Sequence, residues 1–242
     1  MARRGTAVLA SGLMAMIAIG GAGGYGVGWL TALDRSVSAT GKAMPLGQLT
    51  AVTPPPATKP TPDDSRKPQP DDSKPLRVDD LSYETQTFDV QGTLKSKITL
   101  KVPSDWTYSP QSDRNTARFN EANTKRWLRI LSGFPLTRPP AASMAEKVAH
   151  LKALPANQHM TILSQVDDGD VATLTYTFVP AKELQPLPIL RHVIVRWVAD
   201  DSGDVAVELG VTGLPQDAAA LRDVIDHASE SVVRRDVPLA PS

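Results

Sequence analysis

The chain contains no cysteine, which excludes disulfide bonds, thiolate zinc sites and a lipid-modified N-terminal cysteine. Aromatic residues make up only 5% of the 242 residues, and the net charge is zero because 26 basic side chains balance 26 acidic ones. A neutral chain lacks the basic field typical of nucleic-acid-binding proteins, so we expect no nucleic-acid partner.

Charged residues are also absent from residues 5–33, a stretch longer than the about 20 apolar residues that a bilayer core requires. Arg3 and Arg4 precede this stretch, and because positive charge stays on the cytoplasmic side, the rest of the chain is expected outside the membrane. Residues 1–42 are therefore predicted to form a cytoplasmic stub and a single transmembrane anchor. The alternative is a signal peptide cleaved after Ala39, which the length disfavours because signal h-regions span about 7–15 residues.

Three glycines of this anchor, Gly20, Gly24 and Gly28, are four residues apart and share one helical face. Small residues at this spacing let two transmembrane helices approach closely. They indicate a packing partner within the membrane, either a second copy of the chain or another helix. The alternative is that they reflect the general frequency of glycine in apolar spans.

Prolines recur throughout residues 43–80, and few large apolar residues are present there. Because proline fixes φ and removes a hydrogen-bond donor, neither helix nor sheet is expected there. We predict a disordered stalk that reaches on the order of 100 Å at about 3.1 Å per residue, a length suited to crossing a cell wall. A proline-motif ligand for another domain is the alternative.

Residues 81–237 are predicted to form one extracytoplasmic α+β domain, followed by a flexible tail at 238–242. Residues 94–103 alternate between apolar and polar side chains, which predicts a half-buried strand with residues 83–90 as its hairpin partner. Further strands are expected at 126–133, 160–166, 171–179, 189–199 and 205–211. The apolar run at 189–199 favours a central strand.

Two acidic segments, 167–170 and 200–204, separate pairs of these strands. Asp and Gly are the residues that tight hairpin turns require. Carboxylates in such clusters could also bind calcium, but neither segment has the full loop spacing or a distant glutamate. Turns are therefore the favoured interpretation, and no metal site is expected.

Two helices are predicted to cover the antiparallel sheet. Ser143 and Glu146 have the spacing of a capping box, which predicts a helix from residue 143 to about 154. The second begins near Pro215 and carries an apolar stripe of helical period. Arg234 and Arg235 would end it, in agreement with the helix dipole.

This pattern resembles the Mog1/PsbP-like α/β/α sandwich, and within it the LpqN-type envelope lipoproteins. The resemblance covers residues 83–236 and rests on the run 98–103 followed by Trp106, on residues 126–128, on the two hairpins and on the two helices. The chain departs from those lipoproteins in having an apolar anchor instead of a lipidated cysteine. The resemblance implies a domain that binds proteins or ligands, and it transfers no catalytic motif.

Catalytic motifs are missing from the sequence: the nucleophile elbow, the phosphate loop, the dinucleotide fingerprint and HExxH do not occur. His192 lies in an apolar segment, where a satisfied sheet histidine is favoured over a general base because no partner is indicated. We expect no enzyme activity and no cofactor.

Large aromatic and cationic residues offer a candidate binding cleft, because Trp and Arg are enriched at binding hot spots. Its predicted members are Trp106, Trp127, Arg129, His192, Arg196 and Trp197. The favoured alternative is that the tryptophans build the core. A basic cluster, Arg114, Arg118, Lys125, Arg126 and Arg129, is interpreted as a solvated surface, with contact to anionic wall polymer or lipid headgroups as the alternative.

The sequence thus predicts a membrane-anchored extracytoplasmic interaction module of the bacterial cell envelope that docks a protein partner. Two alternatives stay open. The first is a small-ligand or lipid-binding domain that uses a pocket between sheet and helices. The second is an envelope hydrolase, which would need a nucleophile and base or two carboxylates in one cleft.

Overall fold

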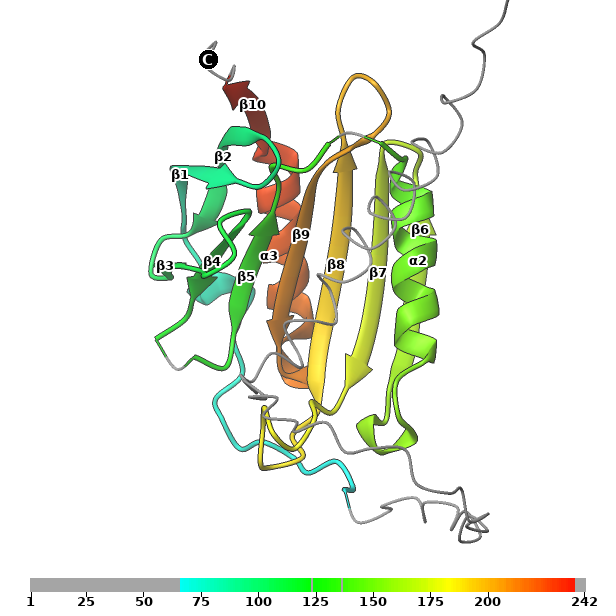
Figure 1. Cartoon of the computed structure of the whole chain (residues 1–242). Coiled ribbons are helices and arrows are strands. Elements are labelled where there is room, and N and C mark those ends of the chain that lie inside the picture. Colours follow the sequence, from blue (N-terminus) through cyan, green and yellow to red (C-terminus); the bar gives the residue numbers. More distant parts are fainter. Residues whose placement is uncertain (1–65, 123, 136, 238–242) are drawn as a thin grey trace, which may run out of the picture. The chain divides into compact units, whose positions relative to one another are not determined.

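Two antiparallel sheets organise the part of the chain that the computed structural model describes, residues 66–122, 124–135 and 137–237 (Figure 1). The large sheet has seven strands in the order β3-β4-β5-β9-β8-β7-β6, and the small sheet has three in the order β1-β2-β10. The large-sheet strands are β3 (Thr107–Pro110), β4 (Thr116–Asn120), β5 (Trp127–Leu131), β6 (Thr161–Asp167), β7 (Val171–Phe178), β8 (Arg191–Ala199) and β9 (Val205–Gly213). The small-sheet strands are β1 (Tyr83–Gln91), β2 (Lys95–Pro103) and β10 (Val233–Val237).

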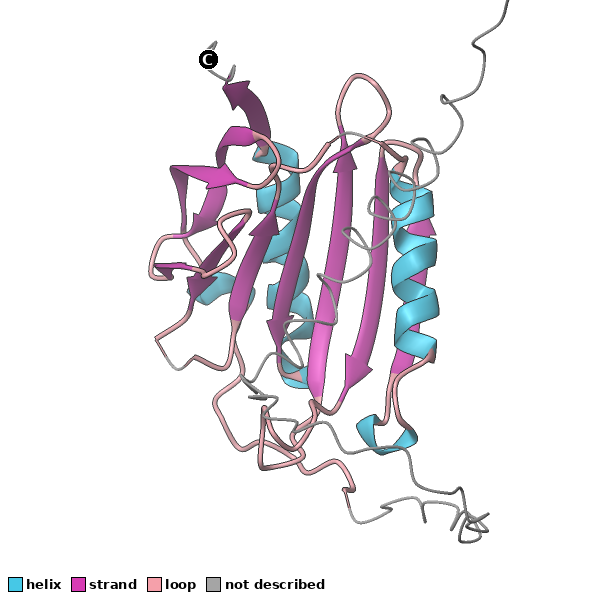
Figure 2. Ribbon diagram, in the orientation of Figure 1, coloured by secondary structure: helices cyan, strands magenta, loops and turns pink. Residues whose placement is uncertain are grey.

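Two helices cover the large sheet, α2 (Pro140–Lys152) and α3 (Ala218–Ser231), and they lie on opposite faces of it (Figure 2). Short 3-10 turns are η1 (Val78–Asp80), η2 (Ala156–Gln158) and η3 (Pro215–Asp217). The predicted α+β class, with an antiparallel sheet and two main helices, is therefore confirmed for this part of the chain.

The alternation in β2 sets up the larger of two cores. Ile98, Leu100 and Val102 are fully buried, whereas Lys97 and Lys101, on the other side of the strand, are exposed. The buried side chains pack with the apolar stripe of α3 and with the inner residues of β4, β5, β8 and β9. Burying each such aliphatic side chain contributes about 1.5–3 kcal/mol to folding.

A second core lies on the other face, where α2 packs on β7 and β8. Met144, Val148 and Leu151 supply the helix side of it. Strand β8 serves both cores, because Val195 faces α2 while Ile194 faces α3. The prediction of a central, doubly apolar strand is thus confirmed.

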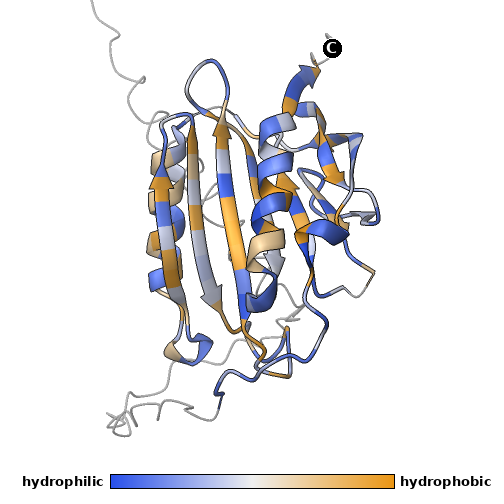
Figure 3. Cartoon of the chain, turned by 180° about the vertical axis from the view of Figure 1, so that it is seen from behind, coloured by the Kyte–Doolittle hydropathy of each residue, from blue (hydrophilic) through white to orange (hydrophobic). Residues whose placement is uncertain are grey.

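Each helix covers only part of its face of the large sheet. On the α3 face, β7 and β6 lie beyond β8, to one side of the helix (Figure 3). Val166 of β6 is 45% exposed there. On the α2 face, the helix packs on β7 and β8, and no helix of the described residues lies over β9, β5 and β4. That second strip holds the candidate functional site.

Both predicted Asp-Gly hairpin turns are present. Gly169 and Gly203 each adopt a φ of +82°, a conformation that glycine tolerates best. Asp167 accepts a hydrogen bond from the Gly169 amide at 3.1 Å, and Asp200 accepts one from the Ser202 amide at 2.9 Å. These acidic side chains therefore act as turn residues, as expected.

The start of α2 differs from the prediction. Pro139 is the N-cap and Pro140 the first helical residue, so Ser143 lies inside the first turn and the capping box is wrong. Glu146 instead forms an ion pair with Arg138. Proline at the first position begins the helix earlier because its missing N–H needs no partner there.

The end of α3 also differs. The helix stops at Ser231, and Arg234 and Arg235 lie in β10, which pairs with β2, so they are not residues of the helix end. Strands β3, β4 and β10 were not predicted at all. Each has only four or five residues, too few for a two-residue period to stand out from the surrounding polar sequence.

The end of the predicted stalk contacts the domain, so the boundary at residue 80 is too late. Gln69 forms a parallel bridge with Ile189, and the carboxylate of Asp71 accepts hydrogen bonds from Lys125 at 2.9 and 3.0 Å. Arg66 donates to the carbonyls of Pro180 and Gln185. Charged residues that look solvated in sequence thus find partners that lie far along the chain. We call residues 66–76 the strap.

The strap is held at its other end by a buried charge cluster. Arg126, 2% exposed, donates to both oxygens of Asp217, to both oxygens of Glu121 and to the carbonyl of Lys74. Asp217 also accepts the Leu76 amide at 2.8 Å. The cluster thereby joins the strap to the η3 turn that begins α3.

The predicted anchor with Gly20, Gly24 and Gly28, the stalk up to residue 65 and the C-terminal tail lie outside the described residues. Among the residues that are described, no helix has the length and apolarity of a membrane span.

Candidate functional site

Six residues define what we call the arginine–tryptophan face, on the α2 side of the large sheet. They are Arg118, Trp127, Arg129, Lys147, Arg191 and Glu208. Strand alternation explains the location: Leu128 and Ile130 of β5 are fully buried in the larger core, so Trp127 and Arg129 point to the other face.

Trp127 lies between two guanidinium groups. The guanidinium carbon of Arg118 is 4.2 Å from the ring centroid, and that of Arg191 is 5.7 Å away. Cations within about 6 Å of a tryptophan ring are attracted to its negative face. The half-buried indole therefore holds the two cations, which come from β4 and β8, close to β5.

Glu208 connects Arg129 to the second core. Its carboxylate pairs with Arg129 and accepts a hydrogen bond from the indole N–H of Trp197 at 2.9 Å. Trp197 is 2% exposed and packs in the core under α2. Because both carboxylate oxygens have partners, the Arg129 side chain is anchored in one position.

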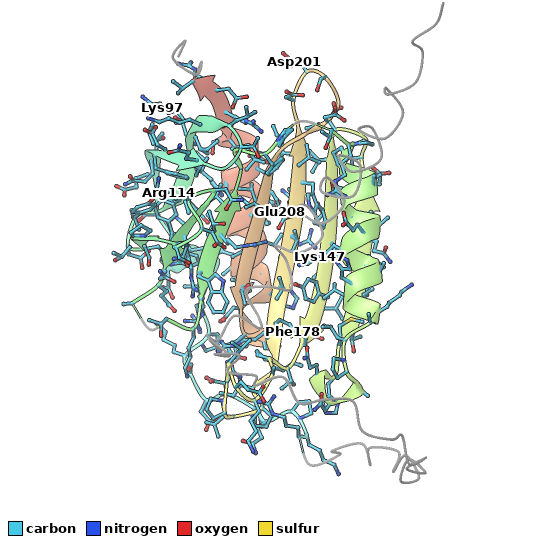
Figure 4. The ribbon with its side chains drawn as sticks, in the orientation of Figure 1. Lys97, Arg114, Lys147, Phe178, Asp201 and Glu208 are labelled. Carbon is cyan, nitrogen blue, oxygen red and sulfur yellow. The ribbon has the colours of Figure 1, made fainter. Side chains whose placement is uncertain are left out.

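Lys147 approaches the same carboxylate from α2 (Figure 4). Burial lowers the pKa of its ammonium group, and the attraction of Glu208 offsets only part of this effect. Burial also raises the pKa of the Tyr176 hydroxyl on neighbouring β7. The boundary between α2 and the open strip is therefore a partly desolvated polar region.

Arg118 and Arg129 are direct cross-strand neighbours in β4 and β5. Like charges at opposed positions of one sheet face destabilise a sheet. Burial, followed by the repulsion from Arg129, lowers the pKa of Arg118 to about 10. The pair thus places two guanidinium groups side by side on this face of the sheet.

The structure does not bring the six residues of the predicted cleft together. Trp106, 4% exposed, belongs to the larger core. Trp127, Arg129 and Trp197 lie on the α2 face, where Glu208 links Arg129 to Trp197. His192 and Arg196 belong to the α3 face, where Arg196 bonds to Thr173 and Ser229 and pairs with Asp226 at 2.7 Å.

His192 is 7% exposed, and burial together with the nearby Arg222 lowers its pKa. Its cross-strand neighbours are Thr177 and Gly213. His192 is therefore buried within the packed sheet.

The predicted basic cluster also separates. Arg126 is buried with Asp217 and Lys125 pairs with Asp71, so only Arg118 and Arg129 of that cluster belong to the face. Lys147, Arg191 and Glu208 were missed. One signal was available, because Glu208 is the only charged residue between Val205 and Gly213. No group of three or more His, Asp or Glu within residues 66–122, 124–135 and 137–237 has the arrangement of a metal site.

Comparisons with known proteins give a fold-level result. No protein-family model and no curated protein matches the chain. The solved structure of the Ran-binding protein Mog1p from Saccharomyces cerevisiae aligns with a TM-score of 0.43 and 12% identity, over 63% of this chain and 96% of that one. LpqN of Mycobacterium tuberculosis, described as involved in cell envelope biogenesis, aligns with a TM-score of 0.35 and 19% identity, over 66% of this chain and 95% of that one. The Mog1/PsbP-like resemblance is therefore found, and it is weak.

Proposed function

We propose that this chain is a non-enzymatic, membrane-anchored interaction module of the bacterial cell envelope, and that its extracytoplasmic domain docks a protein partner on the arginine–tryptophan face. The observation that carries the proposal is Trp127 held between Arg118 and Arg191, with Arg129 opposite Arg118, on a strip that no described helix covers. Trp and Arg are the residue types most enriched at the centres of protein interfaces.

The apolar span and the proline-rich stalk support the location in this proposal. An anchor with its N-terminus in the cytoplasm and a long spacer would present the face at a distance from the membrane. The glycine face of Gly20, Gly24 and Gly28 adds a second contact inside the bilayer, with a partner helix or a second copy of this chain.

A small-ligand or lipid-binding domain is the second candidate. The observation in its favour is the partly desolvated group of Lys147, Tyr176 and Glu208 beside α2, since burial shifts the pKa of the first two. For an envelope hydrolase, the described residues offer no comparable grouping.

The proposal is tested by cross-linking the full-length protein in its own membrane, followed by mass spectrometry of the products. The wild type is compared with Trp127→Ala, with Gly24→Leu, and with Lys97→Gln as a control on the exposed side of β2. Docking on the face predicts one reproducible protein adduct that Trp127→Ala reduces at least about tenfold and that Lys97→Gln leaves unchanged.

Loss of the adduct in Gly24→Leu places an additional contact in the membrane. If the wild type yields only self-adducts or none, docking of another protein is wrong, and the small-ligand candidate becomes the better explanation.

A further inference from the structure

We propose that the outer face of the small sheet is a second binding site, and that its ligand is a linear anionic polymer of the cell wall. Four cations define what we call the lysine face: Lys95, Lys97 and Lys101 of β2 and Arg235 of β10. A wall polymer as the ligand rests on the extracytoplasmic location in the proposed function, but the site is a different surface. Lys97 lies well apart from Glu208 of the arginine–tryptophan face (Figure 4).

Strand alternation and register put the four cations on one side of the small sheet. The alternate residues of β2 point into the larger core, so the three lysines point the other way. Arg235 is directly opposite Lys97 in the β10–β2 pairing, and side chains paired in this way share a face. The helix that packs on β2 is α3, and it contacts the buried side of the strand.

The positive charge of the lysine face is not balanced. Asp89 of β1 is the cross-strand neighbour of Lys97, and its carboxylate lies 3.4 Å from the ammonium group of Lys95. Within the part of the chain that the structure describes, no ion pair or side-chain hydrogen bond involves Lys97, Lys101 or Arg235. Three exposed cations therefore remain available to an anion.

The positive charge is densest where Lys97 and Arg235 meet. Directly opposed residues of an antiparallel pair have Cβ atoms about 4.5–5.5 Å apart, and like charges there destabilise a sheet. A cation on an edge strand such as β10 prevents unwanted strand pairing, but Lys97 belongs to the middle strand of the small sheet, where no edge needs protection. An anionic group bound between these two side chains relieves their repulsion, so we expect the polymer to be held there first.

The arrangement of the cations fits a chain of charges. Lys95 and Lys101 are six residues apart on one strand, which corresponds to about 20 Å. A linear polymer laid along β2 therefore meets the lysines in succession, with Arg235 beside the middle one. Interfacial binding to a bilayer typically adds large apolar side chains such as Trp, Phe or Leu. The exposed apolar residues of the small sheet are the short side chains of Val233 and Val237.

A binding titration of the full-length protein, held in nanodiscs of uncharged phosphatidylcholine, tests the site. The probe is fluorescently labelled poly(glycerol phosphate), and its anisotropy is measured over a range of salt concentrations. Three neutralised charges at about 0.7 each give a slope of about −2 for log K against log[salt]. The double substitution Lys97→Gln with Arg235→Gln should lower the affinity at low salt at least about tenfold and bring the slope to about −0.7.

Two further variants separate the lysine face from the general charge of the protein. The double substitution Lys152→Gln with Lys182→Gln removes the same charge from exposed positions on α2 and the β7–β8 loop, and it should leave the affinity unchanged. Asp89→Asn releases Lys95 from its ion pair, so it should raise the affinity and steepen the slope by about 0.7. A gain of binding is a result that misfolding does not produce.

Three results would overturn the lysine face as a polymer site. They are no binding of poly(glycerol phosphate) by the wild type, an affinity that ignores the Lys97 and Arg235 substitutions, and an equal loss in the Lys152 and Lys182 control. Vesicles with phosphatidylglycerol present the same glycerol phosphate group on a flat surface. Co-sedimentation with them that is stronger, per phosphate, than polymer binding would make a bilayer the ligand and overturn the linear polymer.

The lysine face and the arginine–tryptophan face fail independently. Intact polymer binding without a protein adduct on Trp127 would overturn only the docking of a protein partner. An intact protein adduct without polymer binding would overturn only the lysine face.

Discussion

Arg126 and Asp217 lie 91 positions apart in the chain and form a buried, two-point ion pair. Arg126 donates from Nε at 2.6 Å to one carboxylate oxygen and from Nη2 at 2.9 Å to the other. The Asp217 side chain is completely buried and also accepts the amide of Leu214 at 2.9 Å. One carboxylate thus joins the residue before β5, the η3 turn and the strap.

Replacing Asp217 with asparagine should lower the free energy of unfolding by about 3–5 kcal/mol. The substitution keeps the size of the side chain but removes the negative charge that balances the buried Arg126 guanidinium. Removing one partner of a buried ion pair destabilises a protein by this amount because the other charge is left uncompensated. Urea unfolding followed by tryptophan fluorescence measures it. Asp201→Asn, in an exposed hairpin turn, is the control and should stay within about 0.5 kcal/mol. A change below about 1 kcal/mol in Asp217→Asn would contradict the role given to the pair.

The attachment of the strap should depend on pH. Burial by itself raises the pKa of Asp71, but the hydrogen bonds from Ser73 and Lys125 outweigh it and lower the pKa from 3.8 to about 2. A folded-state pKa below the unfolded value stabilises the protein above about pH 4, and this stabilisation is lost as pH falls toward 2.

The difference in unfolding free energy between the wild type and Asp71→Asn should therefore be full at pH 6 and shrink steadily between pH 4 and pH 2. Asp72→Asn, in which the next aspartate, an exposed one, is changed, is the control. A difference that stays constant across this range would show that the ionised form of Asp71 is not what holds the strap.

Two glycines meet where the β1–β2 turn passes the end of β5. A Cβ added at Gly92 would lie 2.6 Å from the carbonyl oxygen of Gly133, a backbone atom that cannot move aside cheaply. We expect Gly92→Ala to destabilise the domain more than Gly169→Ala does.

Gly169→Ala is informative because its φ of +82° is strained for alanine while nothing lies within 4 Å of the added carbon. It should cost about 1 kcal/mol from backbone strain alone. Equal losses of thermal stability in the two variants would mean that the close approach of the Gly92 and Gly133 backbones is not restrictive.

The length of the apolar span predicts that the anchor is retained in the mature protein. N-terminal sequencing of protein purified from the membrane should give the residues at the start of the chain. A first residue of Thr40 would instead show cleavage after Ala39 and replace the membrane-anchored module with a released one.

The local pattern of the sequence determined most of the secondary structure. The alternation in 94–103, the doubly apolar run at 189–199 and the two Asp-Gly turns each reflect an interaction between near neighbours, so they could be recognised without tertiary contacts. The apolar stripe of α3 was visible for the same reason, because residues three or four apart share one face.

Tertiary structure alone decided what the charged residues do. Arg126 looks like its neighbours Lys125 and Arg129 in sequence, yet it is buried because Asp217 and Glu121 reach it from other elements. Sheet order likewise put Trp127 and Arg129 on one face and His192 and Arg196 on the other, which divided the predicted cleft. Local periodicity fixes which side chains share a face of a strand, but only the pairing of distant strands fixes which faces meet. The predictions of an anchor and a stalk therefore rest on composition, whereas the strap and the arginine–tryptophan face exist only in the folded chain.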